Sequence, residues 1–214
     1  MEEAMRIKAI AVSVVLAAST LLALSQSASA SALPTPAAHT ASAAFPDCTA
    51  GLAPNSKAAP IVDCFATPQQ ALAYANHDRS YLTLSRRDAL QVEGMDVSGR
   101  PSAVSPRSIC ASCSGYQLGV DYKDTHFGGS RLVWYSTTGD CQSGVVYQVA
   151  HMPSGWNDVV SSAADTNQLC SRWYHYHDAS YVGKIIDCAG NCYDMYLSDG
   201  TSMSDQTSSE RWYR

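Results

Sequence analysis

Apolar and polar residues alternate along the C-terminal half of the chain. Tyr116, Leu118, Val120 and Tyr122 alternate with polar or small residues, a period of two that places one strand face on a core and the other in solvent. Short runs rich in β-forming residues follow, separated by Gly, Ser, Asp and Asn. They span residues 131–135, 144–149, 172–176, 184–187 and 192–197. Many short strands with turn signals predict an all-β antiparallel sandwich rather than βαβ units.

The N-terminal half carries one clear helix signal. Thr67 is a suitable N-cap, Pro68 suits the first helical position, and Gln70 completes a capping box, which predicts a short helix ending near residue 76. The segment 47–107 contains too few large apolar residues to predict an independent core. We interpret it as a small disulfide-linked N-terminal block that ends in a linker.

The start of the chain has the pattern of a secretory signal peptide. Arg6 and Lys8 precede a largely apolar run over residues 9–24, and small residues crowd positions 28–32. The run is short for a membrane span and is interrupted by hydroxyl residues. We predict that residues 1–30 are a signal peptide, and that the mature protein is secreted, extracellular and free of the membrane.

Residues 31–46 consist almost entirely of Ala, Ser, Thr and Pro. Such a composition buries too little apolar surface to offset the entropy lost on ordering. The segment is predicted to be a flexible tether.

Charge excludes one class of partner. The chain carries a net charge of −5, and the predicted signal peptide contains two acids and two bases, so its removal leaves that charge unchanged. Residues 31–116 hold six acids and six bases, whereas residues 117–214 hold eleven acids and six bases. The absence of a basic surplus argues against nucleic acid as a partner, and the acidic C-terminal half suits either a cation-binding region or a soluble surface.

Eight cysteines lie beyond the predicted signal peptide. An even number in an exported chain is typical of a disulfide framework. Proximity favours pairing Cys48 with Cys64 and Cys188 with Cys192, and the remaining pairs stay open.

The C-terminal half contains an internal repeat. An aromatic residue, a second aromatic five positions later and a glycine two positions after that occur twice, 54 residues apart. Two rings bracing a hairpin, with glycine at a positive φ, would give this pattern a physical role. Two copies of four strands fit residues 117–214. The repeated residues are Tyr122, Phe127 and Gly129, and then Tyr176, Tyr181 and Gly183.

Each copy is followed by an oxygen-rich loop, the two lying 47 residues apart. Residues 157–162 read Asn-Asp-Val-Val-Ser-Ser, and residues 204–209 read Ser-Asp-Gln-Thr-Ser-Ser. Carboxylate, hydroxyl and backbone carbonyl oxygens are the hard ligands that calcium takes. In the alternative interpretation, Asp158 and Asp205 only form Asx-turns and the serines only bond the loop backbone.

With these motifs, the region 108–214 resembles a βγ-crystallin domain of the microbial calcium-signature type, in which two Greek-key motifs form a sandwich. The resemblance implies two Ca²⁺ sites shared between adjacent loops. Ser204 stands where the signature has Asn or Asp, which implies one competent and one impaired site. The implicated ligands are the side chains of Asn157, Asp158, Ser161, Asp205 and Ser208 and the backbone carbonyls of Val159 and Gln206.

No nucleophile elbow, metalloprotease helix or phosphate loop occurs in the sequence, so no catalytic residue is assigned and no enzyme is expected. We expect a structural or extracellular interaction module. The chain is also similar to secreted bacterial metalloproteinase inhibitors of the crystallin fold, which implies a secreted protease as partner. The corresponding loop is Cys188, Ala189, Gly190, Asn191 and Cys192.

That loop has no bulky apolar side chain to fill a specificity pocket, and a bare hairpin staple is the competing interpretation. A secreted toxin-like protein of the same fold is a further alternative. The oligomeric state does not follow from the sequence.

Overall fold

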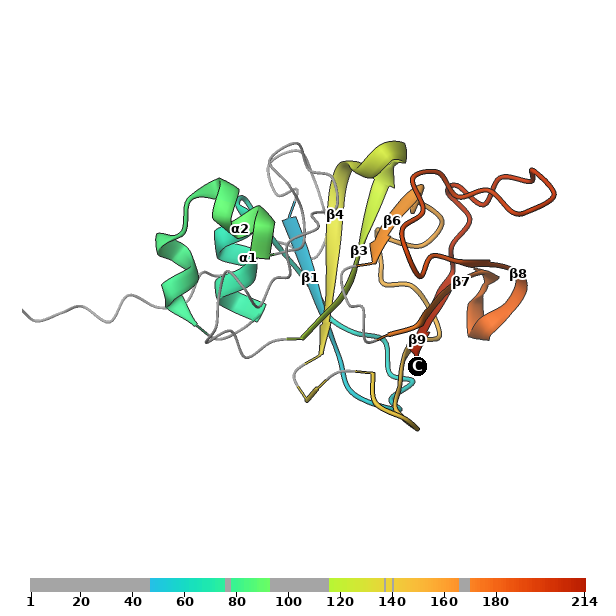
Figure 1. The fold of residues 1–214 in the computed structure, drawn as a ribbon, viewed down its shortest axis with the longest axis horizontal. Helices are drawn as coiled ribbons and strands as arrows, with labels where there is room; N and C mark the ends of the chain where they lie inside the picture. Colours follow the sequence, from blue (N-terminus) through green and yellow to red (C-terminus); the bar gives the residue numbers. More distant parts are fainter. Residues whose placement is uncertain (1–46, 76–77, 93–115, 137, 140, 166–169) are drawn as a thin grey trace, which may run out of the picture. The chain divides into compact units, whose positions relative to one another are not determined.

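A computed structural model describes residues 47–75, 78–92, 116–136, 138–139, 141–165 and 170–214, which Figure 1 draws in colour. Several predicted features lie outside the described residues. They are the signal peptide, the tether, the linker near residues 99–107 and two of the eight cysteines, Cys110 and Cys113. Within the described part of the chain, no helix is long and apolar enough to cross a membrane.

Two β-sheets form the described structure, which confirms the all-β fold class. One sheet has five strands in the order β2-β1-β4-β3-β6, and the other has four in the order β5-β9-β7-β8. All pairings are antiparallel except the one between β1 and β4. The strands are β1 Asp47–Leu52, β2 Val62–Phe65, β3 Tyr116–Asp124, β4 Gly128–Ser136, β5 Val146–Val149, β6 Ser162–Asp165, β7 Arg172–Asp178, β8 Val182–Asp187 and β9 Ser209–Tyr213.

The two repeat copies exchange strands. β5 belongs to the first copy but pairs with β9 of the second. In return, Cys192 of the second copy bridges Ala163 on β6 through two backbone hydrogen bonds of 2.9 and 2.8 Å. The strand expected over residues 192–197 is reduced to this bridge and an isolated one at Tyr196. The repeated region therefore supplies three strands, not four, to the first sheet.

The N-terminal block extends the sheet of the first copy. β1 runs parallel to β4, with Asp47 opposite Arg131 and Leu52 opposite Ser136, and every residue of β1 except Gly51 is buried. The block has few large apolar residues of its own, but its first strand is covered because it lies within a larger sheet. A disulfide between Cys48 and Cys64 joins β1 to β2.

Two short helices follow β2. The expected helix is α1, Pro68–Ala75, and the Thr67 hydroxyl accepts a hydrogen bond from the Gln70 amide at 3.3 Å. The second, α2 Arg86–Val92, was not predicted. Its signal is present as a capping arrangement in which the Ser85 hydroxyl accepts from the Asp88 amide at 3.1 Å and donates to the Asp88 carboxylate at 2.7 Å.

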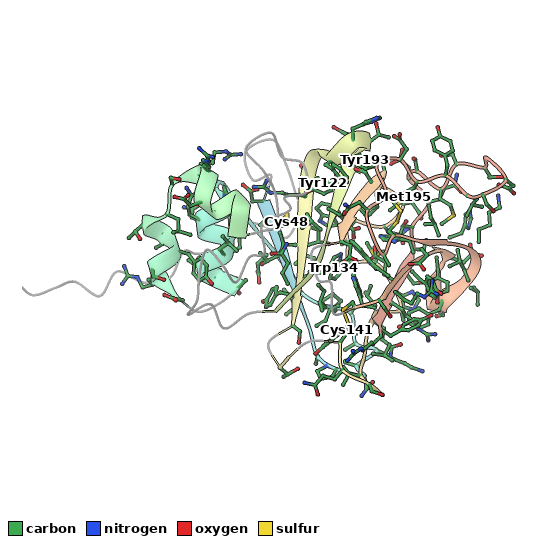
Figure 2. All side chains as sticks on the ribbon, in the orientation of Figure 1. Cys48, Tyr122, Trp134, Cys141, Tyr193 and Met195 are labelled. Atoms are coloured by element: carbon green, nitrogen blue, oxygen red, sulfur yellow. A yellow bond between two sulfur atoms is a disulfide. The ribbon has the colours of Figure 1, made fainter. Side chains whose placement is uncertain are left out.

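Tryptophan rings fill the space between the sheets. Trp134 on β4 contacts Trp212 on β9 at 5.4 Å between ring centroids, and Trp212 stacks on Trp173 of β7 at 5.3 Å. All three are fully buried, and Figure 2 shows Trp134 within the interior. These three rings belong to one hydrophobic core that contains residues from both sheets.

Three disulfides occur among the described cysteines. Cys48–Cys64 and Cys188–Cys192 are the two pairs that proximity favoured, and Cys141–Cys170 is a third that the sequence left open. Disulfides of this number indicate that the protein folds in an oxidising environment.

Candidate metal centre

The repeated aromatic and glycine residues form two equivalent hairpins. Tyr122 and Phe127 lie 5.4 Å apart between ring centroids, and their counterparts Tyr176 and Tyr181 lie 5.7 Å apart. At Gly129 (φ 73°), an added Cβ would lie 2.7 Å from the Asp124 carboxylate. At Gly183 (φ 81°), an added Cβ would likewise lie 2.5 Å from the Asp178 carboxylate. Both backbone conformation and space therefore require glycine after each ring pair.

The last serine of each oxygen-rich loop is hydrogen-bonded to the backbone of a hairpin. The Ser162 hydroxyl donates to the Asp124 carbonyl at 2.6 Å and accepts from the Phe127 amide at 2.9 Å. These bonds commit the hydroxyl to the backbone, so Ser162 is a structural anchor rather than a metal ligand. In the second copy, the Ser209 hydroxyl donates to the Asp178 carbonyl at 2.7 Å and accepts from the Tyr181 amide at 3.0 Å.

The two oxygen-rich loops lie side by side and are joined reciprocally. The Asp158 amide donates to the Thr207 carbonyl at 3.0 Å, and the Asp205 amide donates to the Val160 carbonyl at 2.9 Å. Both aspartates have a left-handed backbone, with φ of 54° and 57°. The sequence thus encodes two loops of the same shape, and the fold brings them into direct contact.

Side-chain oxygens meet across the loops in two matched pairs. The Ser161 hydroxyl donates to the Asp205 carboxylate at 2.7 Å, and the Ser208 hydroxyl donates to the Asp158 carboxylate at 2.8 Å. Both carboxylates are exposed. Each pair combines an acid from one loop with a hydroxyl from the other, so these serines do not merely bond their own loop backbone.

The first residue of each loop marks the main difference between them. The Asn157 amide donates to the Asp158 carboxylate at 2.6 Å. In the described structure, the Ser204 side chain makes no corresponding hydrogen bond to Asp205. The backbone amide of Ser204 donates to the Ser202 hydroxyl at 3.1 Å. The first acid is therefore held by a neighbouring amide, whereas the second lacks that support.

The donor set fits a hard cation. Carboxylate and hydroxyl oxygens converge from both loops, and the carbonyls of Val159 and Gln206 accept no hydrogen bond from the described residues. Calcium takes six to eight oxygen ligands with flexible geometry, as such mixed oxygens supply. Four of the side chains that the sequence implicated are thus brought together in two pairs, Ser161 with Asp205 and Ser208 with Asp158.

The loop 188–192 is closed by its disulfide and fixed to the first sheet. Ala189 and Gly190 are exposed, and an added Cβ at Gly190 would meet nothing within 4 Å. The Asn191 side-chain oxygen accepts from the Asp165 amide on β6 at 2.9 Å. The loop thus staples the second copy to the first while leaving its tip open to solvent.

The sequence reasoning missed a buried polar cluster between the sheets. Asp121 on β3, His175 on β7 and Glu210 on β9 are each fully buried, and their ligand atoms all lie within 4.8 Å of one another. Burial, together with the charge of Asp121, raises the pKa of Glu210 well above its ordinary value. One signal was available, because Asp121 and His175 are 54 residues apart, the offset of the repeat.

Comparison with known proteins adds a limited structural likeness. No protein-family model and no curated protein matches the chain. A "beta gamma crystallin from Ciona Intestinalis" is similar over 43% of this chain and 94% of that one, at 20% identity and a TM-score of 0.32. A betagamma-crystallin from an archaeon is similar over 45% of this chain and 98% of that one, at the same identity and TM-score. A likeness at this identity and TM-score carries no argument about family, and the description of the fold rests on the strand order and paired hairpins given above.

Proposed function

We propose that this protein is a secreted, calcium-binding, crystallin-like module that acts as a structural or extracellular interaction element rather than as an enzyme. The observation that supports it best is the reciprocal pairing of Ser161 with Asp205 and of Ser208 with Asp158. Two acids and two hydroxyls that converge from separate loops form a donor set suited to Ca²⁺.

In this proposal, calcium acts as a clamp between the two copies. Asp158 and Asp205 supply negative charge, Ser161 and Ser208 supply hydroxyl oxygens, and the carbonyls of Val159 and Gln206 add neutral ligands, with Asn157 orienting Asp158. Each cluster needs both loops, so only the folded chain binds well. Extracellular sites bind at about 10⁻⁴ to 10⁻³ M, and a tenfold excess over such a constant stabilises the fold by about 1.4 kcal/mol per site.

Calcium titration of the purified protein tests this proposal. Calorimetry should show calcium binding to the wild type, and its melting temperature should rise by several degrees, because about 1 kcal/mol shifts a domain of this size by about 4–8 °C. Asp158→Ala should abolish most of the rise, and Asp205→Ala should abolish less of it, because its loop lacks the amide neighbour.

The matched control is Asp199→Ala, which removes an equal charge from an exposed turn outside both loops, where Asp199 bonds the Thr201 amide. Its calcium response should equal that of the wild type. An unmoved wild-type melting temperature would contradict the proposal, as would a larger loss for Asp205→Ala than for Asp158→Ala.

The exposed tip of the loop 188–192 supports a second candidate function, inhibition of a secreted metalloprotease. A loop held by a disulfide and by Asn191 is ordered before binding, which reduces the entropy lost in a protease cleft. Ala189→Leu adds a bulky side chain at the exposed tip and avoids Gly190, whose φ of 117° disfavours any side chain, so it should alter inhibition of a panel of zinc proteases and leave the fold intact. Equal inhibition by both proteins, or none by either, would remove the loop from consideration.

A further inference from the structure

The buried cluster between the two sheets has the arrangement of a ligand set. His175 and Glu210 are directly opposite each other on β7 and β9, and Asp121 projects from β3 in the facing sheet. His175 Nε2 lies 3.1 Å from Asp121 Oδ1 and 3.6 Å from Glu210 Oε1. Three potential ligand atoms from three strands and both sheets therefore converge on one point.

Two indole groups orient the carboxylates. Trp134 Nε1 donates to Asp121 Oδ2 at 2.7 Å, and Trp173 Nε1 donates to Glu210 Oε2 at 3.0 Å. One oxygen of each carboxylate is held in this way. The other oxygen of Asp121 is hydrogen-bonded to His175 Nε2, and the other oxygen of Glu210 lies 3.6 Å from the same nitrogen. Outer hydrogen bonds of this kind orient ligands in metal sites.

The remaining oxygen of Glu210 lacks a hydrogen bond. Glu210 Oε1 is buried and has no hydrogen-bond partner among the described residues, and the side chain is fully buried. Two carboxylates and one imidazole thus share a fully buried site, where an uncompensated charge is strongly unfavourable. A dication would displace the proton that the raised pKa of Glu210 favours, neutralise the two carboxylates and bond the unpaired oxygen.

We propose that Asp121, His175 and Glu210 bind one zinc-class divalent cation that links the two sheets. Zinc bonds to imidazole nitrogen and carboxylate oxygen are about 2.0–2.2 Å long, which places tetrahedral ligand atoms about 3.4 Å apart. The 3.1 and 3.6 Å separations bracket that value. Calcium is disfavoured because it requires six to eight oxygen ligands and does not select imidazole, so this site is chemically distinct from the oxygen-rich loops.

The second nitrogen of His175 sets the expected strength of the site. Coordination through Nε2 leaves the proton on Nδ1, which is buried and has no hydrogen-bond partner among the described residues. Metal-bound histidines usually donate this proton to an acceptor, and losing such a partner weakens binding by about 10–100-fold. Affinity should accordingly be lower than in a fully supported zinc site, while burial makes exchange slow.

Refolding with and without zinc tests the proposal. The disulfide-bonded protein is unfolded in guanidinium chloride with EDTA, refolded with Zn²⁺ or without metal, gel-filtered and analysed for bound metal by mass spectrometry. The wild type refolded with zinc should retain one ion per chain, resist removal by EDTA until it is unfolded, and melt at a higher temperature than the metal-free sample. Glu210→Gln keeps an acceptor for Trp173 but removes a charged ligand, so its affinity for zinc should fall by at least about tenfold, and less than one ion per chain should remain after gel filtration.

Two controls separate this site from others. His177→Ala removes the partly exposed imidazole that pairs with Asp178 at 2.7 Å, and Asp205→Ala alters the oxygen-rich loops. Both variants should retain zinc as the wild type does. Cobalt(II) refolded into the wild type should give visible absorption bands of a low-coordinate site, a readout that does not depend on any variant folding.

Three results would overturn the proposal. The first is a wild-type protein that retains no zinc after refolding with it and shows no cobalt bands. The second is zinc that EDTA removes at once from the folded protein, which would place the ion on the surface. The third is a folded Glu210→Gln variant that retains a full equivalent.

Discussion

The two repeat copies match closely at their loops and differ at their centre. The loop hydrogen bonds occur in reciprocal pairs, such as Ser161 to Asp205 and Ser208 to Asp158. In the core, positions 54 residues apart carry different residues, Gly119 against Trp173 and Asp121 against His175. These unlike equivalents contact each other, since an added Cβ at Gly119 would lie 2.6 Å from the Trp173 ring and Asp121 lies 3.1 Å from His175.

This difference has a physical origin. A residue in the loops meets a different residue of the other copy, so both copies can keep the same sequence there. A residue near the axis that relates the copies meets its own equivalent. Two indoles cannot occupy one space, and two buried carboxylates at that distance would repel each other. A bulky or charged residue at this centre therefore needs an unlike equivalent, and chemistry absent from the repeat can arise there.

The largest effect should come from removing the bulky member of the central pair. Trp173→Ala leaves a cavity beside Trp212 and removes the hydrogen bond to Glu210. Truncating a buried tryptophan lowers the free energy of unfolding by about 3–5 kcal/mol. Chemical denaturation of wild type and variant measures the loss, and a value below about 1 kcal/mol would show that the ring does not fill the core as described.

Filling the small member of the pair should be the next largest effect. Gly119→Ala places a methyl group against the Trp173 ring, and overpacking of this kind destabilises by about 1–3 kcal/mol. In the Trp173→Ala background, the same change should have almost no effect, because the cavity accepts the methyl group. A double-mutant cycle isolates this coupling, and additive losses would contradict direct contact between the two positions.

Removing the serine that anchors each hairpin should destabilise the protein equally in the two repeat copies. Ser162→Ala and Ser209→Ala each remove a buried hydroxyl that both donates to and accepts from the backbone of a hairpin. Leaving those groups unpaired should lower the free energy of unfolding by about 1–2 kcal/mol. The two losses should agree to within about 0.5 kcal/mol, near the precision of such comparisons. Denaturation curves that differ by much more would mean that the anchors are not equivalent.

The sequence predicted the parts of this fold whose pattern is local. The alternation from Tyr116 to Tyr122, the cap at Thr67 and the repeated loops each lie within a few residues, and each corresponds to an observed element. β6 and β9 escaped prediction because they bury polar residues, including Ser162 and Glu210, whose partners lie on distant strands. The polar residues of these two segments predicted exposure to solvent, whereas in the fold the buried ones are hydrogen-bonded to other strands.

Pairings between strands that are distant in the sequence could not be predicted from local sequence patterns. The parallel contact of β1 with β4 joins residues more than 80 positions apart, and nothing within β1 indicates its neighbour. The buried cluster combines three strands in the same way. Its members Asp121 and His175 share the repeat offset, and only the fold brings Glu210 to them.

The smallest expected effect concerns the first residue of each oxygen-rich loop, one of three positions at which the two loops differ. Ser204→Asn gives the second loop the side chain that bonds the acid in the first, where Asn157 donates to Asp158 at 2.6 Å. Asn157→Ser makes the first loop like the second. At about ten times the dissociation constant, a site contributes about 1.4 kcal/mol, so Ser204→Asn should increase the calcium-induced rise in melting temperature by at most that free energy. Asn157→Ser should reduce the rise by a similar amount. Melting temperatures without calcium should differ little, because Asn157 is exposed and Ser204 is only half-buried. If both variants respond to calcium as the wild type does, the first residue of each loop does not set calcium affinity and the two loops are functionally alike.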